Sequence, residues 1–216
     1  PGQFVAAYRA AAEEADAIVA IVTTRSLTAT VDAAQASAQE AGLQERVVVV
    51  DSGTAGPAQA FIVLAAARAA QQGAAAQEVV AVAQQYRQRI NQMFSLDDLS
   101  YLQRGGRIGL AASLLGSKLR IHPVLTLAQG VVRPVAIART QQSALERIVA
   151  RMRDAVGARP VRAAVLHADR LHYAERLCEQ VKREFHCIEH FIADFTPVMG
   201  AHTGPGVVGV AYCLED

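Results

Sequence analysis

The segment Arg46-Val-Val-Val-Val-Asp-Ser-Gly-Thr-Ala-Gly-Pro57 decides the fold class of this 216-residue chain. Its run of valines is too continuously apolar for a strand with one face in water, so we expect a strand buried on both faces. The Asp-Ser-Gly-Thr stretch is typical of a turn, and Pro57 suits the first position of a helix. The same order occurs upstream, with a strand over residues 17–22 and a helix over residues 31–41. Strands that alternate with helices predict a parallel sheet covered by helices.

The pattern changes after Met93-Phe-Ser-Leu-Asp97. Residues 121–127 and 131–138 have the pattern of a β-hairpin closed by Ala128-Gln-Gly130. We also expect helices over residues 4–15, 77–90, 142–156 and 173–184, a short helix after Gly105-Gly106, a strand over residues 161–167 and two closing strands. The sequence therefore predicts two domains. Residues 1–98 form an N-terminal, Rossmann-like α/β domain that is incomplete at its start, and residues 99–216 form a mixed α/β domain with antiparallel pairing.

Composition narrows the class of protein. Hydrophobic residues make up 52% of the chain, yet no apolar run is long enough to span a bilayer. The net charge of +1 gives no reason to expect a nucleic acid as partner. Cys178, Cys187 and Cys213 are too few for a disulfide framework, and Pro1–Ala11 lacks the features of a signal peptide. We therefore expect a soluble, cytoplasmic protein without a transmembrane segment. The first residue is not methionine, which suggests a processed or partial chain.

The segment from Leu99 to Leu145, called here the basic segment, is strongly biased in charge. It contains no acidic residue but six basic ones: Arg104, Arg107, Lys118, Arg120, Arg133 and Arg139. An ordinary solvated basic face would explain this bias. An anion site or a docking surface for an acidic partner would explain it equally well.

The closing segment His202-Thr-Gly-Pro-Gly206 is the most informative motif. Two glycines around a proline permit a tight turn that can approach a ligand closely, and His202 and Thr203 offer polar groups for an anionic head. Residues 204–209 also match the dinucleotide pattern G-x-G-x-x-G. We reject that match because the pattern requires a following helix, whereas a strand and the end of the chain follow here.

Two further segments each allow a structural and a functional interpretation. Thr23-Thr-Arg-Ser-Leu-Thr-Ala-Thr30 follows a strand and opens a helix, so its hydroxyls either cap that helix or face a ligand beyond the strand end. Gly105-Gly-Arg-Ile108 is either the end of a helix followed by a core helix, or a hinge that carries Arg107 toward an anion.

Metal and enzyme motifs are weak. His186-Cys-Ile-Glu-His190 does not offer the four well-placed ligands that zinc requires, so we expect no metal. The chain contains neither a G-x-S-x-G nucleophile elbow nor a phosphate-binding P-loop.

Six segments, taken together, resemble the DegV family, the fatty-acid-binding subunits that serve bacterial fatty acid kinases. They are Leu27-Thr-Ala-Thr30, Val49-Val-Asp-Ser52, Leu99-x-Tyr-Leu-x-x-Gly-Gly-Arg-Ile108, Leu119-Arg-Ile-His-Pro-Val124, Arg139-Thr140 with Ala144, and His202-Thr-Gly-Pro-Gly206. The resemblance implies a long-chain fatty acid bound between two α/β domains and a separate kinase that phosphorylates its carboxylate. It thus implies a lipid carrier without a catalytic centre, with no cofactor besides the bound lipid.

The resemblance also implies roles for individual residues. Thr28 stands where the family has a serine that meets the carboxylate, and His202, with Thr203 beside it, matches the histidine of the closing motif. Arg107 and Arg139 match arginines that face the head group or the kinase. The chain departs from the family at Thr28-Ala-Thr30, which replaces Ser-Gly-Thr, and at His122, which replaces a lysine. It also lacks the strand and Asp-Ser-rich turn with which the family begins.

The physical chemistry of a lipid carrier fits this interpretation. A fatty acid needs a long apolar cavity with a few polar groups at one end, and Leu110, Leu114, Leu115 and Ile121 are available to line it, although ordinary core packing explains them equally well. Two other classes remain open: a small-molecule hydrolase or transferase that uses His202 with a hydroxyl group, and a purely structural or regulatory protein.

Overall fold

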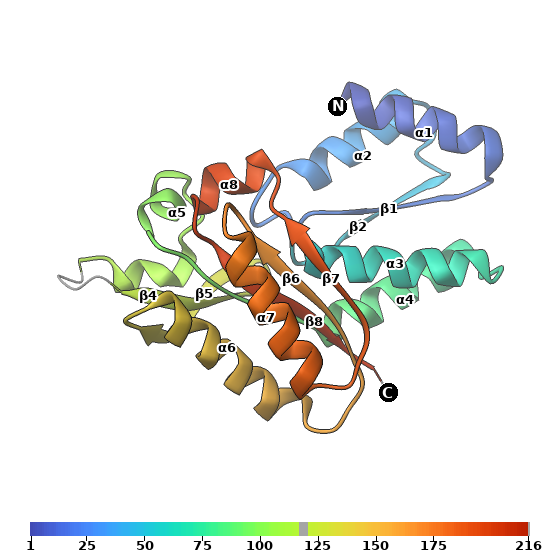
Figure 1. Ribbon diagram of the computed structural model, residues 1–216. Coiled ribbons are helices and arrows are strands. Elements are labelled where there is room, and N and C mark those ends of the chain that lie inside the picture. Colours follow the sequence, from blue (N-terminus) through green and yellow to red (C-terminus); the bar gives the residue numbers. More distant parts are fainter. Residues whose placement is uncertain (117–120, 216) are drawn as a thin grey trace. The chain divides into compact units, whose positions relative to one another are not determined.

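The chain forms two compact units, Pro1–Gln88 and Arg89–Asp216, in a computed structural model that describes residues 1–116 and 121–215. Strands alternate with helices in the first unit, and the second contains a mixed sheet, as Figure 1 shows. The predicted α/β class is therefore confirmed. Within the described ranges, no helix is both long enough and apolar enough to cross a membrane.

The first unit is built on two parallel strands. Strand β1 (Ile18–Val22) pairs with β2 (Val47–Asp51) in register from Ile18 opposite Val47 to Val22 opposite Asp51. The helices of this unit are α1 (Gly2–Glu14), α2 (Thr30–Glu40), α3 (Pro57–Gln71) and α4 (Ala76–Arg89). Pro57 is the first residue of α3, as expected, because proline has no N–H to bond at that position.

Part of the core of the first unit joins α1 and α2 to the two strands. Val31 and Ala34 of α2 pack with Val22, while Ala38 packs with Tyr8 of α1 and with Val47. The strands are less buried than their apolar sequences predict, and Val48 exposes 43% of its surface. The described part of this sheet has only two strands, so each strand has a neighbour on one edge only.

The second unit is built on a six-stranded sheet in the order β5-β4-β3-β8-β6-β7. Only β6 and β7 are parallel; the other neighbours are antiparallel. The predicted hairpin is present, and its turn residues Gln129 and Gly130 have φ values of 52° and 76°, as two-residue hairpin turns require. The strands are β3 (Ile90–Ser95), β4 (His122–Ala128), β5 (Val131–Ala138), β6 (Val161–His167), β7 (Cys187–Asp194) and β8 (Val208–Leu214).

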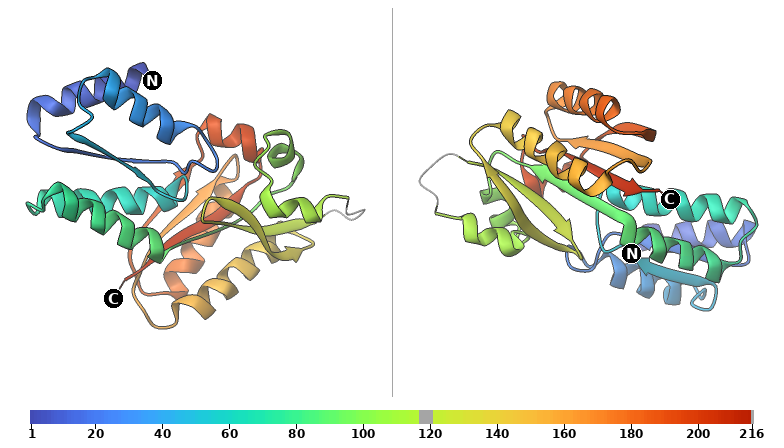
Figure 2. Two further views of the ribbon diagram at one scale, coloured as in Figure 1. Left: turned by 180° about the vertical axis from the view of Figure 1, so that it is seen from behind. Right: turned by 90° about the horizontal axis from the view of Figure 1, so that it is seen from below.

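The main hydrophobic core lies between this sheet and two helices, α6 (Gln141–Val156) and α7 (Leu171–Glu184), which Figure 2 shows on one face of the sheet. Ile148 and Met152 of α6 are fully buried against strand residues that include Val165 and Tyr212. Burial raises the pKa of Tyr212 to about 12. The remaining elements are α5 (Ser100–Arg104), the 3-10 helix η1 (Gly109–Leu114) and α8 (Pro197–Thr203).

Two elements were not predicted from the sequence. Strand β3 follows α4 directly, without turn residues, and its buried Gln92 hides the apolar pattern of a strand. Helix α8 is short and begins at a proline, with the Thr196 side chain as its cap. Because β3 pairs with β4 and β8, the division between the units lies between Gln88 and Arg89, upstream of the position near residue 98 that the sequence suggested.

The packing of α6 leads to a stability prediction. Replacing Ile148 with alanine leaves a cavity in the core of the second unit and is expected to lower the free energy of unfolding by about 2–5 kcal/mol. Ile137→Ala is the matched control, because Ile137 on β5 is 48% exposed, and it is expected to cost less than about 1 kcal/mol. Urea unfolding followed by circular dichroism measures both; equal losses would contradict the placement of α6.

Candidate functional site

In the first unit, polar side chains gather where the two parallel strands end. Thr24, Ser52 and Thr54 are all buried. The Ser52 N–H donates to the carbonyl of Val22, and the Thr24 N–H donates to the carbonyl of Thr54, both at 3.0 Å. These bonds hold the two strand ends together, at the edge where α/β sheets bind ligands. The Thr54 Oγ1 is buried and has no hydrogen-bond partner among the described residues.

Thr28 lies in the loop that precedes α2. Its Oγ1 accepts a hydrogen bond from the Thr30 N–H at 3.2 Å and lies 2.7 Å from the Thr30 Oγ1. When Thr30 donates in that hydroxyl pair, Thr28 keeps its own proton for an acceptor such as a carboxylate. Thr28 thus satisfies one backbone donor at the start of the helix, while Ala29 at the N-cap provides no side-chain cap. The structural and the functional interpretations of this segment are compatible.

In the second unit, the closing motif meets the Gly-Gly-Arg motif. His202 lies on α8, which contacts α5, and an added Cβ at Gly105 would come within 2.6 Å of the His202 Nδ1. Only a residue without a side chain allows this approach. The His202 Nδ1 is buried and has no hydrogen-bond partner among the described residues. A buried polar atom without a partner is costly, so a ligand group that bonded it would be stabilised.

Arg107 lies next to the same glycine. Its guanidinium donates to the Gly105 carbonyl at 2.5 Å, and its backbone N–H donates to the Leu102 carbonyl at 2.9 Å. The second bond closes the end of α5 in the manner of a helix C-cap. Arg107 and His202 therefore both lie against Gly105, although the two residues are far apart in the sequence.

Thr203 is placed differently from its neighbour. It is 6% exposed, and its Oγ1 donates to backbone carbonyls, at 3.1 Å to Met199 and 3.3 Å to Gly204. A hydroxyl has one proton to donate, and here it is directed at the backbone of α8. The contribution of Thr203 in this conformation is to hold the end of α8.

Arg139 directly follows β5 and lines a cavity of about 560 Å³. It is exposed and has no hydrogen-bond or ion-pair partner among the described residues. His122, Asp97 and Arg170 line the same cavity. Of the basic segment, Lys118 and Arg120 lie outside the described residues, as does Leu119.

The residues expected to line a lipid tail are partly exposed. Leu110 exposes 54% of its surface and Leu115 38%, whereas Leu114 and Ile121 are half-buried. The neighbouring Ala111 is fully buried, and η1 packs on β5. Exposed leucines beside a buried alanine form an apolar surface on η1 that a hydrocarbon chain would cover favourably.

Sequence reasoning missed a network around Asp97. The Asp97 carboxylate forms an ion pair with Arg170 at 2.9 Å and lies 3.5 Å from the His122 Nδ1, and an added Cβ at Gly206 would meet it. His167, buried at the end of β6, pairs with Asp194 at 2.9 Å. The sequence pattern that could have indicated His167 is a polar residue at the end of a mostly apolar strand.

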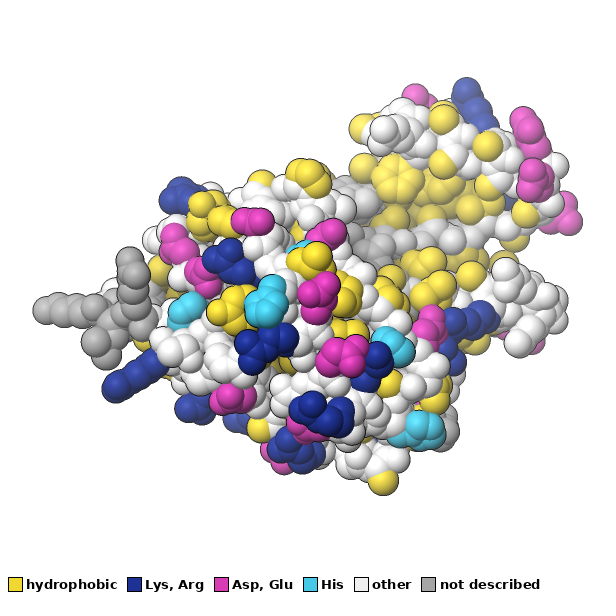
Figure 3. All heavy atoms as spheres, viewed as in Figure 1, with side chains coloured by type: hydrophobic (Ala, Val, Ile, Leu, Met, Phe, Trp, Pro, Cys, Tyr) yellow, Lys and Arg dark blue, Asp and Glu magenta, His cyan; other side chains and the backbone are white. Residues whose placement is uncertain are grey.

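The first unit also carries an apolar groove of about 370 Å³, visible among the hydrophobic side chains in Figure 3. Val19 and Ile21 of β1 lie on one side of it, and Val63, Ala66 and Ala70 of α3 on the other. Its lining is almost wholly apolar, so it suits hydrocarbon rather than a charged head group.

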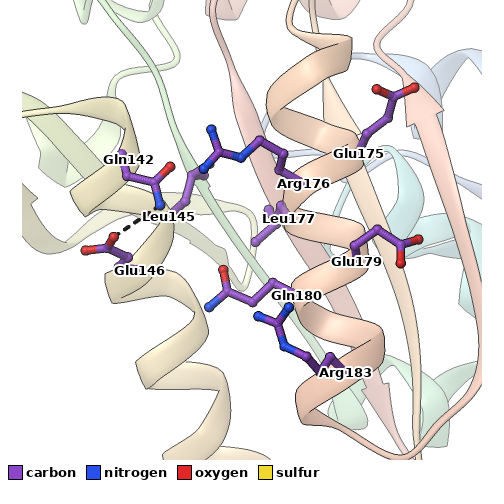
Figure 4. A pocket seen from close by; sticks show the side chains of 9 residues that line it. All are labelled: Gln142, Leu145, Glu146, Glu175, Arg176, Leu177, Glu179, Gln180 and Arg183. Atoms are coloured by element: carbon purple, nitrogen blue, oxygen red, sulfur yellow. Dashed lines mark hydrogen bonds between the residues drawn. The ribbon is translucent and has the colours of Figure 1, made fainter.

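A groove of about 490 Å³ separates α6 from α7 (Figure 4). Leu145 and Leu177 lie in it, and the Gln142 side chain donates to Glu146 at 3.1 Å. Charged side chains of both signs, such as Glu179 and Arg183, project around it. In the ranges that the structure describes, no group of three or more histidine, cysteine or acidic residues is arranged to hold a metal ion.

Comparison with known proteins gives consistent matches over the chain. A family model described as "Uncharacterised protein, DegV family" matches residues 1–215. A DegV domain-containing protein of Streptomyces coelicolor is 37% identical over 212 residues, which are 97% of this chain and 75% of that protein. Protein DegV of Bacillus subtilis is 31% identical over 216 residues, which are 99% of this chain and 76% of that protein.

Solved structures agree with these matches. A DegV family protein from Thermus thermophilus, described by its fatty acid binding, has a TM-score of 0.92 and 33% identity, covering 100% of this chain and 77% of its own. DegV from Bacillus subtilis, described as a fatty acid binding protein, has a TM-score of 0.86 and 29% identity, covering 99% and 76%. The fold described above is the fold of these proteins.

The contact between Gly105 and His202 can be tested directly. Gly105 has ordinary helical dihedral angles, so alanine introduces no backbone strain there, but its methyl group is expected to displace the His202 ring. Gly200→Ala, on the same helix as His202, is the control, because an added Cβ there meets no atom within 4 Å. Imidazole nitrogen chemical shifts from NMR should move in Gly105→Ala and stay unchanged in Gly200→Ala; an unmoved ring in both would contradict the packing.

Proposed function

Because the chain belongs to the DegV family, we propose that it binds one long-chain fatty acid and presents the carboxylate to a separate fatty acid kinase. The observation that carries the proposal is the likeness over the whole chain to a Thermus thermophilus protein described by its fatty acid binding. The kinase step extends the proposal. A carboxylate oxygen would attack the terminal phosphorus of the kinase's phosphoryl donor. The bond from that phosphorus to the donor's bridging oxygen would break, the rest of the donor would leave with that oxygen and the bond's electron pair, and the chain would hold the resulting acyl phosphate.

A polar group in each unit supports a role in binding a head group. His202 in the second unit has an unpartnered Nδ1, and Thr28 in the first unit has a hydroxyl that can donate to an acceptor. Both suit a carboxylate, which accepts hydrogen bonds and donates none when it is ionised. Arg107, which lies at the same glycine as His202, adds positive charge.

Apolar surface supports the binding of a tail. Burial of a hydrocarbon chain stabilises the complex by about 0.8 kcal/mol per CH₂, so affinity comes mainly from the tail and orientation from the head. Leu110, Leu114, Leu115 and Ile121 are the proposed lining residues of the second unit. Their partial exposure leaves apolar area for a ligand to cover.

The alternative of a hydrolase or transferase has less support. Thr203, the hydroxyl next to His202 in the chain, donates to backbone carbonyls. Burial also raises the pKa of the Cys178 and Cys187 thiols, which disfavours the thiolate form that a nucleophile requires.

The proposal predicts a stoichiometric lipid and defined binding losses. Native mass spectrometry of the purified protein, incubated with palmitate or oleate, should detect one bound acyl chain. His202→Ala and Thr28→Val should each weaken binding by about one to two decades, because a hydrogen bond to a charged group contributes about 1.5–3 kcal/mol. The sequence predicts that both side chains hold one carboxylate, so the double variant should lose less than the sum of the single losses.

His190→Ala is the control for these variants, because His190 is an exposed histidine on the edge strand β7. It is expected to keep the affinity of the unaltered protein. A protein that retains no acyl chain after incubation would refute the carrier function, and equal losses in His190→Ala and His202→Ala would refute the role of His202.

A second prediction concerns the kinase. Arg107→Glu and Arg139→Glu reverse charges within the basic segment and should slow acyl phosphorylation by the cognate kinase by at least about tenfold, with folding unchanged. Arg151→Glu, an exposed position on α6 outside that segment, is the control. If both charge reversals left the rate of acyl phosphorylation unchanged, the basic segment would be an ordinary solvated face.

A further inference from the structure

We propose that the outer edge of β7 is an interface through which two copies of this chain pair as antiparallel strands. The interface goes beyond the proposed fatty acid binding and does not depend on it. β7 ends the six-stranded sheet, and in the described part of the chain it has β6 as its one neighbour. A strand at the edge of a sheet presents unpaired backbone groups that another strand can bond.

One hydrogen bond shows which backbone groups of β7 face outward. The Phe195 N–H donates to the carbonyl of His167, the last residue of β6, at 2.8 Å. Successive residues of a strand direct their N–H and C=O groups to opposite edges. The groups of His190, Ile192 and Asp194 therefore point away from β6. Among the described residues, nothing bonds the outward groups of these three.

The opposite edge of the sheet is protected against such pairing. β5 contains Pro134, which has no N–H to offer to a partner strand. The 3-10 helix η1 also lies against β5, because an added Cβ at Gly109 would come within 2.6 Å of the Val132 carbonyl oxygen.

β7 lacks most of this protection. Its eight residues include no proline, lysine or arginine, the residues that commonly prevent pairing at an edge. A shift in register opposite Val161 and Arg162 disturbs only the start of the strand. The segment from Glu189 to Phe195 is thus available for pairing.

The side chains of this segment fit a second copy of the same strand. Ile192 is 36% exposed, the Asp194 side chain is 82% exposed, and His190 is exposed as well. Directly opposite residues of an antiparallel pair lie on the same face and alternate together between bonded and non-bonded positions. When Ile192 lies opposite the partner's Ile192, His190 therefore lies opposite the partner's Asp194. Two apolar side chains meet at the centre, and an imidazole faces a carboxylate on each side of them.

Charge complementarity selects this register and a second copy as the occupant. Sliding one strand by two residues in one direction sets His190 against the partner's Ile192, and in the other direction it sets Ile192 against the partner's Asp194. Either shift removes both histidine–carboxylate pairs. Asp194 already pairs with His167 at 2.9 Å, but its exposed carboxylate can accept further hydrogen bonds. The edge is thus complementary to itself around Ile192, as a two-fold symmetric contact requires.

The pairing is expected to be weak and reversible. Two single strands form a small contact compared with the roughly 1,200–2,000 Å² that stable interfaces bury. We therefore expect the dimer to form as the concentration of the protein rises through the range from about 1 μM to about 1 mM.

Sedimentation velocity of the whole chain over this concentration range tests the interface. The unaltered protein should shift from monomer to dimer. Ile192→Lys sets two like charges opposite each other at the two-fold axis and should weaken the dimer by about tenfold or more. Ile137→Lys, on the protected edge strand β5, is the control because Ile137 is 48% exposed, and it should associate as the unaltered protein does. A protein that stays monomeric at about 1 mM, or equal association in the two variants, would overturn the proposal.

Mixing two variants tests the register. His190→Asp opposes carboxylate to carboxylate in its own dimer, and Asp194→His opposes imidazole to imidazole, so each variant alone should associate about tenfold more weakly than the unaltered protein. In a one-to-one mixture, every such position again pairs a histidine with an aspartate, so association should be restored. Circular dichroism checks that both variants keep the fold. A mixture that associates no better than its components would overturn the proposed pairing.

Discussion

The insertion of β8 between β3 and β6 is the constraint on which the second unit depends. β8 is the last strand of the chain, and it is hydrogen-bonded along both edges, to β3 from Ile90 to Ser95 and to β6 from Val161 to His167. Its start is thereby held next to the ends of both neighbours. The closing motif that precedes it must therefore lie against Asp97, which follows β3, and against Ala168, which follows β6. The position of His202 against Gly105 belongs to the same arrangement.

Polar groups of the second unit concentrate at the edge of the sheet where β3, β6 and β7 end, and this has a physical reason. Strand interiors are apolar because they pack under α6 and α7, so the first polar residues occur where the strands end. His167 and Asp194 are the last residues of β6 and β7, and Asp97 follows the end of β3. Some of these groups pair with one another, as Asp97 does with Arg170. Others, such as the His202 Nδ1 and the Gln141 Nε2, are buried without a partner in the described part of the chain. Such unsatisfied atoms cost stability and are expected where a ligand supplies the missing bond.

Much of the fold could be predicted because hydrophobic periodicity is a local property. The pattern of α6 buries Ile148 and Met152 on one side, and the hairpin turn at Gln129-Gly130 has its own chemical signature. The pattern failed where pairing with distant strands overrides local preference. β3 carries the buried Gln92. Its backbone carbonyl accepts a hydrogen bond from the Thr126 hydroxyl of β4 at 2.7 Å, and no local sequence pattern predicts such a bond.

The sequence by itself determined the α/β class, the motif segments and the residue types available for an anionic ligand, because each depends on neighbouring residues in the chain. Tertiary structure alone decided which of these residues meet. It placed His202 against Gly105, and it assembled the Arg139 cavity from two helix starts and the Asp97 network. These contacts join segments separated by tens of residues, so their geometry follows from the order of strands in the sheet rather than from any local pattern.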